Sequence, residues 1–283
     1  MTVSIQTWIH EKTLELESSG FLDDARFSCL ILLSHFLNVD TTWIFIHSQD
    51  DLPNELLTIL NIHFEELKRG RPLPYIIGEW DFFGYRFNIS EAVLIPRPET
   101  ELLVKTAIEW LNQQTSENRS FIDVGTGTGC IPVSILMNID YASGLAIDIS
   151  IRALKIAADN RSTYNLENRL QLVCGDLLTP IIQKFNLITA NLPYIPTKKL
   201  ETTEVKKHEP LLALDGGIDG FGLIKRLLID SVNKITKPGL ILLEIEEDQG
   251  EDIEFIAAQS FPNGKILIHK DYANRDRFVQ IEL

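Results

Sequence analysis

A glycine-rich turn between a predicted strand and a predicted helix is the feature that most limits the fold. The apolar residues Phe121 and Ile122 lead through Asp123 and Val124 into this turn, and the apolar run from Cys130 follows it. Its residues are Gly125, Thr126, Gly127, Thr128 and Gly129. Three glycines let the backbone turn tightly and approach a ligand without Cβ clashes. The turn indicates a nucleotide-binding α/β domain, although a purely structural turn would have the same pattern.

Alternating strand and helix patterns follow this turn and define the fold class. We predict strands at 120–124, 143–148, 169–174, 185–190, 239–245, 264–269 and 276–282. Helices are expected between them, at about 129–139, 150–160, 217–236 and 248–259. This alternation predicts a mostly parallel sheet covered on both faces. The last two strands are joined by a short polar turn and must therefore be antiparallel neighbours.

The first part of the chain has a different organisation. Residues 1 to about 70 have apolar residues at helical spacing and predict a small helical bundle. A weakly alternating stretch with a turn signal at Gly84 predicts a β-hairpin. The prolines of 95–98 exclude a helix and separate the two parts. We therefore predict an N-terminal helical domain (1–80), a hairpin linker (81–98) and an α/β domain (99–283).

Composition excludes several classes of protein. The net charge of −14 argues against a general nucleic-acid binder, which needs a basic face. Three scattered cysteines indicate a reducing compartment rather than a disulfide framework, and the six histidines lack ligand spacing, so no metal site is expected. The acidic N-terminus does not resemble a signal peptide, and no apolar run is long enough to span a bilayer. We expect a cytoplasmic protein with no membrane partner.

Carboxylates follow the second and third predicted strands. Asp148 ends the second strand, where a carboxylate can accept both ribose hydroxyls of a nucleoside. The turn reads G-x-G-x-G rather than the dinucleotide G-x-G-x-x-G, which favours S-adenosylmethionine over NAD. Asp176 follows the third strand, where it could accept from an adenine amino group with Leu177 against the ring. A turn or helix-capping aspartate is an equally good interpretation of Asp176.

The fourth strand ends in Asn191, Leu192, Pro193 and Tyr194. In an open α/β sheet this position faces the same crevice as the glycine turn. The Asn191 side-chain oxygen and the Leu192 carbonyl can each accept one hydrogen of a planar –NH2 group. Pro193 stiffens the turn, and Tyr194 offers a ring to stack on. Orientation of the nitrogen toward a sulfonium methyl group would favour direct transfer.

These motifs, together with two earlier segments, resemble a known family. The segments are Arg71-Pro72-Leu73-Pro74-Tyr75-Ile76-Ile77-Gly78-Glu79 and Leu94-Ile95-Pro96-Arg97-Pro98-Glu99-Thr100-Glu101, and Asp276-Arg277-Phe278 adds to them near the end. The whole chain resembles the N5-glutamine methyltransferases of peptide chain release factors.

The resemblance implies a fold, a cofactor and a substrate. The fold is a seven-stranded Rossmann-like S-adenosylmethionine-dependent methyltransferase domain, preceded by a small all-α substrate-recognition domain and a β-hairpin linker. The substrate is the glutamine in the Gly-Gly-Gln loop of a release factor, and no nucleic acid is contacted directly. The cofactor positions match residues 125–129, Asp148 and Asn191, and the glutamine-binding and catalytic loop matches 191–194. Arg97, Glu99 and Thr100 are expected near the site.

The chain departs from the family pattern at two places. Leu192 replaces a proline, and leucine should serve because only its carbonyl is needed. Glu244-Ile245-Glu246 replaces Glu-Ile-Gly, within a run of acids that ends at Glu254. These acids are interpreted as a solvated face at a helix N-terminus, or alternatively as an attraction for a basic substrate.

Three other functions use the same residues. A glutamine methyltransferase acting on a ribosomal protein would share the catalytic loop. An adenine N6-methyltransferase would hold an exocyclic –NH2 in that loop, although the net charge opposes it. A regulatory nucleotide-binding module would keep the glycine turn but has no use for residues 191–194.

Overall fold

The computed structural model describes residues 3–20, 24–115, 119–203, 207–271 and 273–283. The chain packs as two compact units, Met1–Glu79 and Trp80–Leu283. The predicted linker 81–98 therefore packs within the second unit. Phe82 and Phe87 are buried in its core.

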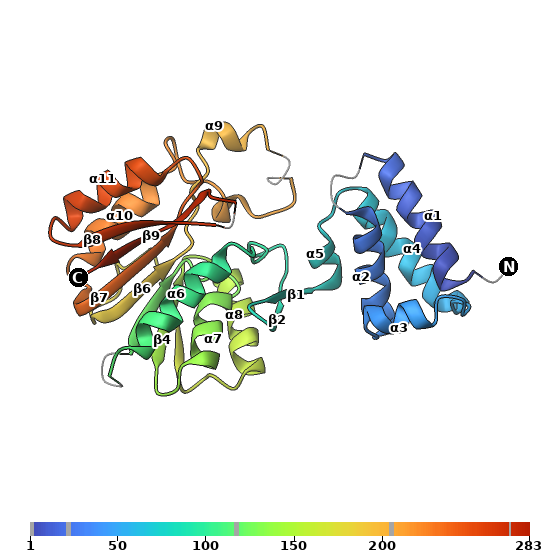
Figure 1. Ribbon diagram of the computed structural model, residues 1–283, viewed down its shortest axis with the longest axis horizontal. Helices are drawn as coiled ribbons and strands as arrows, with labels where there is room; N and C mark the ends of the chain where they lie inside the picture. Colours follow the sequence, from blue (N-terminus) through green and yellow to red (C-terminus); the bar gives the residue numbers. More distant parts are fainter. Residues whose placement is uncertain (1–2, 21–23, 116–118, 204–206, 272) are drawn as a thin grey trace. The chain divides into compact units, whose positions relative to one another are not determined.

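The first unit is helical. Its helices are α1 (Ile5–Ser18), α2 (Ala25–Leu37), α3 (Thr41–Ile46), α4 (Asn54–Lys68) and α5 (Leu73–Ile77) (Figure 1). Ser4, Asp24 and Asp40 cap the first three by accepting a backbone N–H, as these residue types favour. Helix α2 supplies five buried residues of the bundle's core, more than any other helix of the unit, which fits its apolar residues on nearly every side. Phe21 and Leu22, expected in that helix, lie outside the described residues.

The second unit begins with a hairpin. Its strands are β1 (Glu79–Phe82) and β2 (Tyr85–Asn88). Phe83 and Gly84 both have positive φ, as the two central residues of a tight hairpin turn require. Helix α6 (Thr100–Asn112) starts after the proline-rich segment.

A seven-stranded sheet forms the body of this unit. Its strands are β3 (Ser120–Val124), β4 (Ser143–Asp148), β5 (Leu170–Cys174), β6 (Phe185–Ala190), β7 (Ile235–Glu244), β8 (Lys265–Lys270) and β9 (Asp276–Glu282), in the order β5-β4-β3-β6-β7-β9-β8. The strands β3 to β7 pair in parallel, and β9 is antiparallel to both β7 and β8. The predicted fold class and the antiparallel final strands are confirmed.

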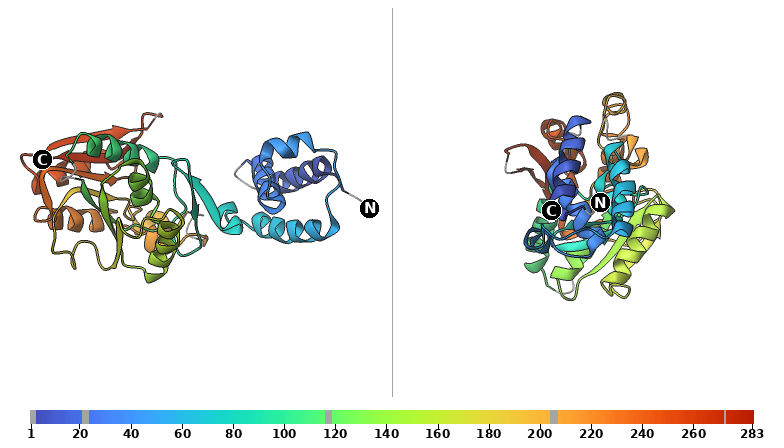
Figure 2. Two further views of the ribbon diagram at one scale, coloured as in Figure 1. Left: turned by 90° about the horizontal axis from the view of Figure 1, so that it is seen from below. Right: turned by 90° about the vertical axis from the view of Figure 1, so that its right-hand side faces the viewer.

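Helices cover both faces of the sheet (Figures 1 and 2). They are α7 (Cys130–Asn138), α8 (Ile151–Thr163), α10 (Gly222–Ser231) and α11 (Gly250–Ser260), together with α6, and the short α9 (Thr197–Leu200) lies in the loop after β6. Residues of one strand alternate between two cores: Leu240 and Leu242 pack with α6 and α7, whereas Ile241 and Leu243 pack with α10 and α11. This is the alternation that a sheet buried on both faces requires.

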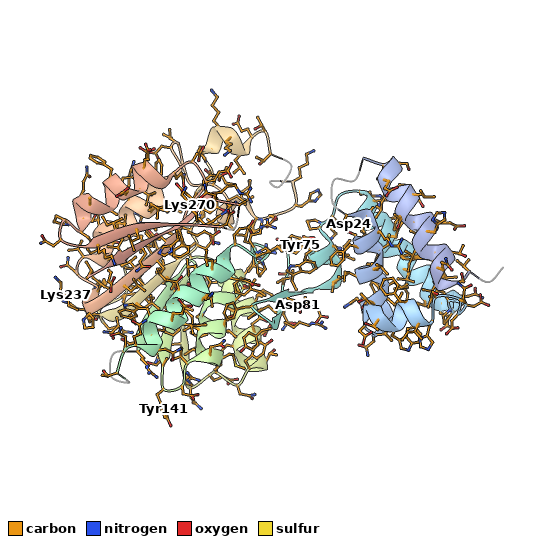
Figure 3. All side chains as sticks on the ribbon, in the orientation of Figure 1. Asp24, Tyr75, Asp81, Tyr141, Lys237 and Lys270 are labelled. Carbon is orange, nitrogen blue, oxygen red and sulfur yellow. The ribbon has the colours of Figure 1, made fainter. Side chains whose placement is uncertain are left out.

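The amino-terminal edge of the sheet is exposed. Tyr141, in the loop that enters β4, and Lys237, near the start of β7, both protrude from the fold (Figure 3). The side chain of Tyr141 is 85% exposed. Residues capable of chemistry gather at the opposite, carboxyl edge.

One predicted element is wrong. We expected a helix over 217–236, but α10 covers only 222–231, and β7 begins at Ile235 rather than 239. Gly217 and Gly220 both have positive φ, which breaks the helical path before Gly222. At the other end, Ile235 pairs with Phe185 of β6 and so belongs to the sheet.

A buried amide holds the hairpin against the glycine turn. The Asn160 side chain, fully buried on α8, accepts from Asn88 N (2.7 Å) and donates to the carbonyls of Asn88 (2.9 Å) and Thr128 (2.9 Å). Both of its N–H groups and one lone pair of its oxygen are used in these contacts. The position of the glycine turn therefore depends on a residue 32 positions further along the chain.

We predict that Asn160→Ala destabilises the second unit. The change removes the partner of the buried Thr128 carbonyl and of the partly buried N–H and carbonyl groups of Asn88, and the expected loss in free energy of unfolding is about 2–4 kcal/mol. Chemical denaturation measures it. The control is Asn138→Ala, which removes an exposed amide on α7 with two hydrogen bonds and should cost less than about 1 kcal/mol. Equal losses in the two variants would contradict the assigned role of Asn160.

Candidate active site

A pocket of about 520 Å³ opens at the carboxyl edge of the sheet. It is lined by residues that follow four parallel strands: the glycine turn after β3, Asp148 at the end of β4, Asp176 after β5 and Asn191 after β6. The strand order reverses between β3 and β6, and crevices at such reversals are the usual ligand sites of open α/β sheets.

The glycine turn is shaped by its backbone. Gly125, Gly127 and Gly129 all have positive φ. A Cβ added at Gly125 would lie 2.8 Å from Leu192 Cδ2, whereas one at Gly127 would meet no atom within 4 Å. Gly129 does not line the pocket; it packs against Ala157 of α8 instead. The turn therefore faces the pocket with Gly127 and packs against its neighbours at the other two glycines.

Asp148 is held in place by backbone donors. Its Oδ1 accepts from Ser150 N (2.8 Å) and its Oδ2 from Gly127 N (2.9 Å). Burial raises the pKa of this carboxyl, and these N–H groups oppose the rise. A carboxylate has about four acceptor positions. This carboxylate therefore keeps acceptor capacity for hydroxyl groups of a ligand in the pocket.

Asp176 and Leu177 both line the pocket. Asp176 Oδ2 accepts from Arg226 Nη2 of α10 at 2.6 Å, so this carboxylate is a partner in an ion pair across the pocket wall. Leu177 is buried and has φ of +49°, a conformation uncommon for a residue with a Cβ. The backbone here is held by its surroundings so that the leucine side chain forms part of the wall.

The loop after β6 is closely packed at Tyr194. Asn191, Leu192 and Pro193 line the pocket, but Tyr194 does not. The Tyr194 carbonyl accepts from Gln249 Nε2 (3.1 Å), and burial raises the pKa of its phenol. A Cβ on Gly220 would lie 2.4 Å from that carbonyl oxygen, so the loop leaves no space there.

Leu192 has a role that the sequence did not indicate. Its side chain is only 4% exposed and belongs to the core beneath the pocket. It fills the space above Gly125. Besides its carbonyl, this residue therefore contributes the contact that joins the loop to the glycine turn.

The proline-rich segment forms another wall. Arg97 and Thr100 line the pocket, whereas Glu99 does not. Arg97 pairs with Glu209, whose second oxygen accepts from Ile95 N at 3.2 Å. Glu209 is 7% exposed, so a single buried carboxylate holds the backbone and the guanidinium of this segment together.

At the wall of the pocket, three hydrogen-bonded polar residues, of which Thr100 and Glu244 are buried, connect three elements. Thr100, at the start of α6, donates from Oγ1 to Oε2 of Glu244, at the end of β7, over 2.6 Å. Asn191 Nδ2 donates to Thr100 Oγ1 over 3.3 Å. Burial raises the pKa of Glu244 to about 7.

A second buried carboxylate lies at the end of β3. Asp123 is fully buried and its Oδ1 accepts from Thr189 Oγ1 (2.7 Å). Its Oδ2 has no hydrogen-bond partner among the described residues, nor has Thr126 Oγ1 of the neighbouring turn. Burial raises the pKa of Asp123 to about 6.

The residues of the pocket fit S-adenosylmethionine. Asp148 keeps free acceptor positions for ribose hydroxyls, the open space at Gly127 admits a ligand against the backbone, and Leu177 supplies an apolar wall for a base. No cluster of three or more metal-ligating side chains occurs in the part of the chain that the structure describes. Within those same residues, no helix is both long and apolar enough to cross a bilayer.

Sequence patterns missed several residues that shape this site. They are Asn160, Glu209, Arg226, Glu244 and Gln249. Each acts through a side-chain contact with a segment distant in the chain. For Glu244, the interpretation as part of a solvated acidic face is wrong, because this residue ends β7 and is only 5% exposed.

Comparisons with known families cover both units. The model of the PrmC N-terminal domain matches residues 7–78, and that of ribosomal protein L11 methyltransferase (PrmA) matches residues 103–247. A release factor glutamine methyltransferase of Thermodesulfovibrio yellowstonii is 34% identical over 254 residues, which are 89% of this chain and 90% of that protein. The corresponding protein of Aquifex aeolicus is 34% identical over 253 residues, 88% of each chain.

Solved structures share the fold of the second unit. The N-terminal domain of human METTL16 in complex with SAH aligns with a TM-score of 0.51 and 16% identity, over 71% of this chain and 76% of that one. At this identity the likeness concerns the fold. The match to the L11 methyltransferase model begins at residue 103 and so leaves out residues 1–102. The two relatives above align over about nine-tenths of the chain.

We predict that Asp148→Ala weakens binding of S-adenosylmethionine about tenfold or more, because a hydrogen bond to a charged acceptor contributes about 1.5–3 kcal/mol. Isothermal titration calorimetry measures the affinity. Asp140→Ala, at an exposed position after α7, is the control and should bind as the unchanged protein does. Unchanged affinity in Asp148→Ala would refute the assignment of this carboxylate.

Proposed function

The chain belongs to the release factor glutamine methyltransferases, and from that premise we propose that it methylates N5 of the glutamine in the Gly-Gly-Gln loop of a peptide chain release factor. The methyl donor is S-adenosylmethionine, the cofactor of this family. We further propose that it acts in translation termination in the cytoplasm, where release factors work. Its three free cysteines suit a reducing compartment.

The placement of Asn191 and Leu192 beside the glycine turn supports this proposal most directly. Both residues line the pocket that also contains Asp148 and Gly127. A cofactor held by the latter two and an amide held by the former would therefore share one chamber. A module that only binds a nucleotide has no need of the loop after β6.

In this reaction the protein's main task is to orient the amide nitrogen of the substrate. An amide nitrogen is a weak nucleophile because its lone pair is delocalised into the carbonyl group. In the proposed complex, Asn191 Oδ1 and the Leu192 carbonyl each accept one hydrogen of the glutamine –NH2 group, which fixes the direction of the nitrogen. When bound, S-adenosylmethionine supplies an electrophilic methyl group.

Rigidity of the loop maintains that orientation. Leu192 is anchored against Gly125, and the Tyr194 carbonyl is bonded to Gln249. A displacement of about 1 Å in such a site can cost on the order of 100-fold in rate. The nitrogen becomes strongly acidic once it carries the methyl group, so its proton can leave afterwards and no covalent enzyme intermediate is needed.

The N-terminal unit has the properties of a separate recognition domain. Residues 1–79 pack around a core of their own, and the PrmC N-terminal domain model matches 7–78. The pocket is lined only by residues from 91 onward. We propose that this unit contacts the body of the release factor and takes no part in cofactor binding.

Methyl transfer to a purified release factor tests the proposed function. The protein is incubated with isotopically labelled S-adenosylmethionine and a release factor, and peptides are mapped by mass spectrometry. We expect one added methyl group on the glutamine of the Gly-Gly-Gln loop and none on a release factor in which that glutamine is alanine. Methylation of isolated ribosomal proteins, with none on release factors, would overturn the proposal.

We predict that Asn191→Ala lowers kcat for release factor methylation by roughly 100-fold, because one of the two acceptors for the amide hydrogens is lost. Steady-state kinetics at saturating cofactor measure this value. Asn112→Ala, at an exposed position of α6, should keep the original kcat. A near-normal rate for Asn191→Ala would show that this loop does not hold the substrate.

We predict that a chain lacking residues 1–79 keeps its affinity for S-adenosylmethionine while its kcat/KM on whole release factor falls at least tenfold. The first expectation follows from the position of every pocket residue after that boundary. Calorimetry and steady-state kinetics test the two halves. Equal kcat/KM for the truncated and complete chains would remove the recognition role.

A further inference from the structure

Asn191 rests on a short chain of hydrogen bonds that ends in a buried acid. Thr100 is 3% exposed and Glu244 is 5% exposed, so both lie out of solvent behind the catalytic loop. The Thr100 hydroxyl donates to Glu244 Oε2 at 2.6 Å and accepts from Asn191 Nδ2 at 3.3 Å. The three residues come from α6, from the loop after β6 and from the end of β7.

A hydroxyl group has a single hydrogen, and this fixes the direction in which the hydrogen bonds from Asn191 to Glu244 run. When Thr100 donates its hydrogen to Glu244, it can only accept from Asn191. The Asn191 amide must then turn its nitrogen toward Thr100, which leaves its oxygen for another donor. The proposed function needs that oxygen to receive a hydrogen from the substrate amide.

We propose that Glu244 is a positioning residue for methyl transfer: through Thr100, its carboxylate fixes the Asn191 amide with the nitrogen inward and the oxygen toward the substrate glutamine. This inference rests on the proposed function. Glu244 touches neither the substrate nor the pocket, since it is absent from the residues that line it. Its effect reaches Asn191 through the hydroxyl of Thr100 and also directly, because the Asn191 amide is itself a hydrogen-bond partner of the Glu244 carboxyl.

The charge of Glu244 is set by several neighbours. Burial is the main reason that its pKa lies near 7. The hydrogen bonds from Thr100 and Asn191 lower this pKa, and the negative charge of Glu99 raises it. Arg277 of β9, which is itself paired with Asp271, lowers it. Tyr194 and Cys130 also face this carboxyl, and both are neutral because burial raises the pKa of each.

Protonation of Glu244 reverses the direction of these hydrogen bonds. A protonated carboxyl can donate to the Thr100 hydroxyl, which then donates to the oxygen of Asn191. The amide turns over and presents its N–H group to the N–H group of the substrate, which is repulsive. Because the deprotonated carboxylate is the form that orients Asn191, kcat should be high above about pH 7 and fall as the pH drops below it.

The pH dependence of kcat in the complete protein tests this inference. At saturating S-adenosylmethionine and release factor, we expect the kcat of the unchanged protein to fall about tenfold per pH unit below pH 7. Glu244→Gln should remove this dependence, because glutamine has no proton to gain. Glu246→Gln, two residues away and paired with Lys199, is the matched control and should keep it.

A second pair of variants separates positioning from folding. Thr100→Val removes the hydroxyl at nearly constant volume and should lower kcat at least tenfold at pH 8, with the KM for S-adenosylmethionine changed less than threefold. Thr100→Ser keeps the hydroxyl and should restore kcat to within about threefold of the original. Melting temperatures of all variants are measured beside the kinetics.

Two results would overturn the inference. One is a Glu244→Gln variant that keeps the same fall in kcat below pH 7, and the other is a Thr100→Val variant that turns over at the original rate. Either result leaves the proposed function intact if the unchanged protein methylates release factor. Absence of methylation by the unchanged protein would instead refute the proposed function itself.

Discussion

The parallel pairing of β3 with β6 is the constraint on which the site depends. In this register Val124 lies beside Ala190, the last residue of β6. The next residues, Gly125 and Asn191, therefore leave the sheet side by side, although 66 positions separate them. Leu192 then packs against Gly125 and closes the contact. One ladder of backbone hydrogen bonds therefore places both the glycine turn and the loop after β6.

Buried carboxylates support this arrangement at a cost in stability. Asp123 and Glu244 are out of solvent and have pKa values of about 6 and 7, so each is easier to protonate than an exposed acid. Each hydrogen-bonds a threonine: Thr189 for Asp123 and Thr100 for Glu244. Between about pH 4 and pH 7 such groups make the folded state less stable as the pH rises, because folding then buries a charge. That these destabilising carboxylates lie beside the proposed substrate loop fits a role in orientation rather than in stability.

Local patterns in the sequence predicted most of the sheet and the residues at its carboxyl edge. Apolar runs, glycines and strand-terminal polar residues are local signals, and Asp148 and Asn191 were found from them. The helix over 217–236 failed because the glycines before Gly222 and the pairing of Ile235 with Phe185 outweighed its apolar spacing. Side-chain partners across the fold could not be found this way. Glu244 meets Thr100 across 144 positions, and Arg226 meets Asp176 across 50.

A crystal structure of the protein with S-adenosylhomocysteine and a peptide containing Gly-Gly-Gln tests the central claim most directly. The account predicts that the glutamine side-chain nitrogen lies within about 3.2 Å of both Asn191 Oδ1 and the Leu192 carbonyl oxygen, with the Asn191 nitrogen toward Thr100. A glutamine bound elsewhere, or with its nitrogen turned away from these two oxygens, would contradict it.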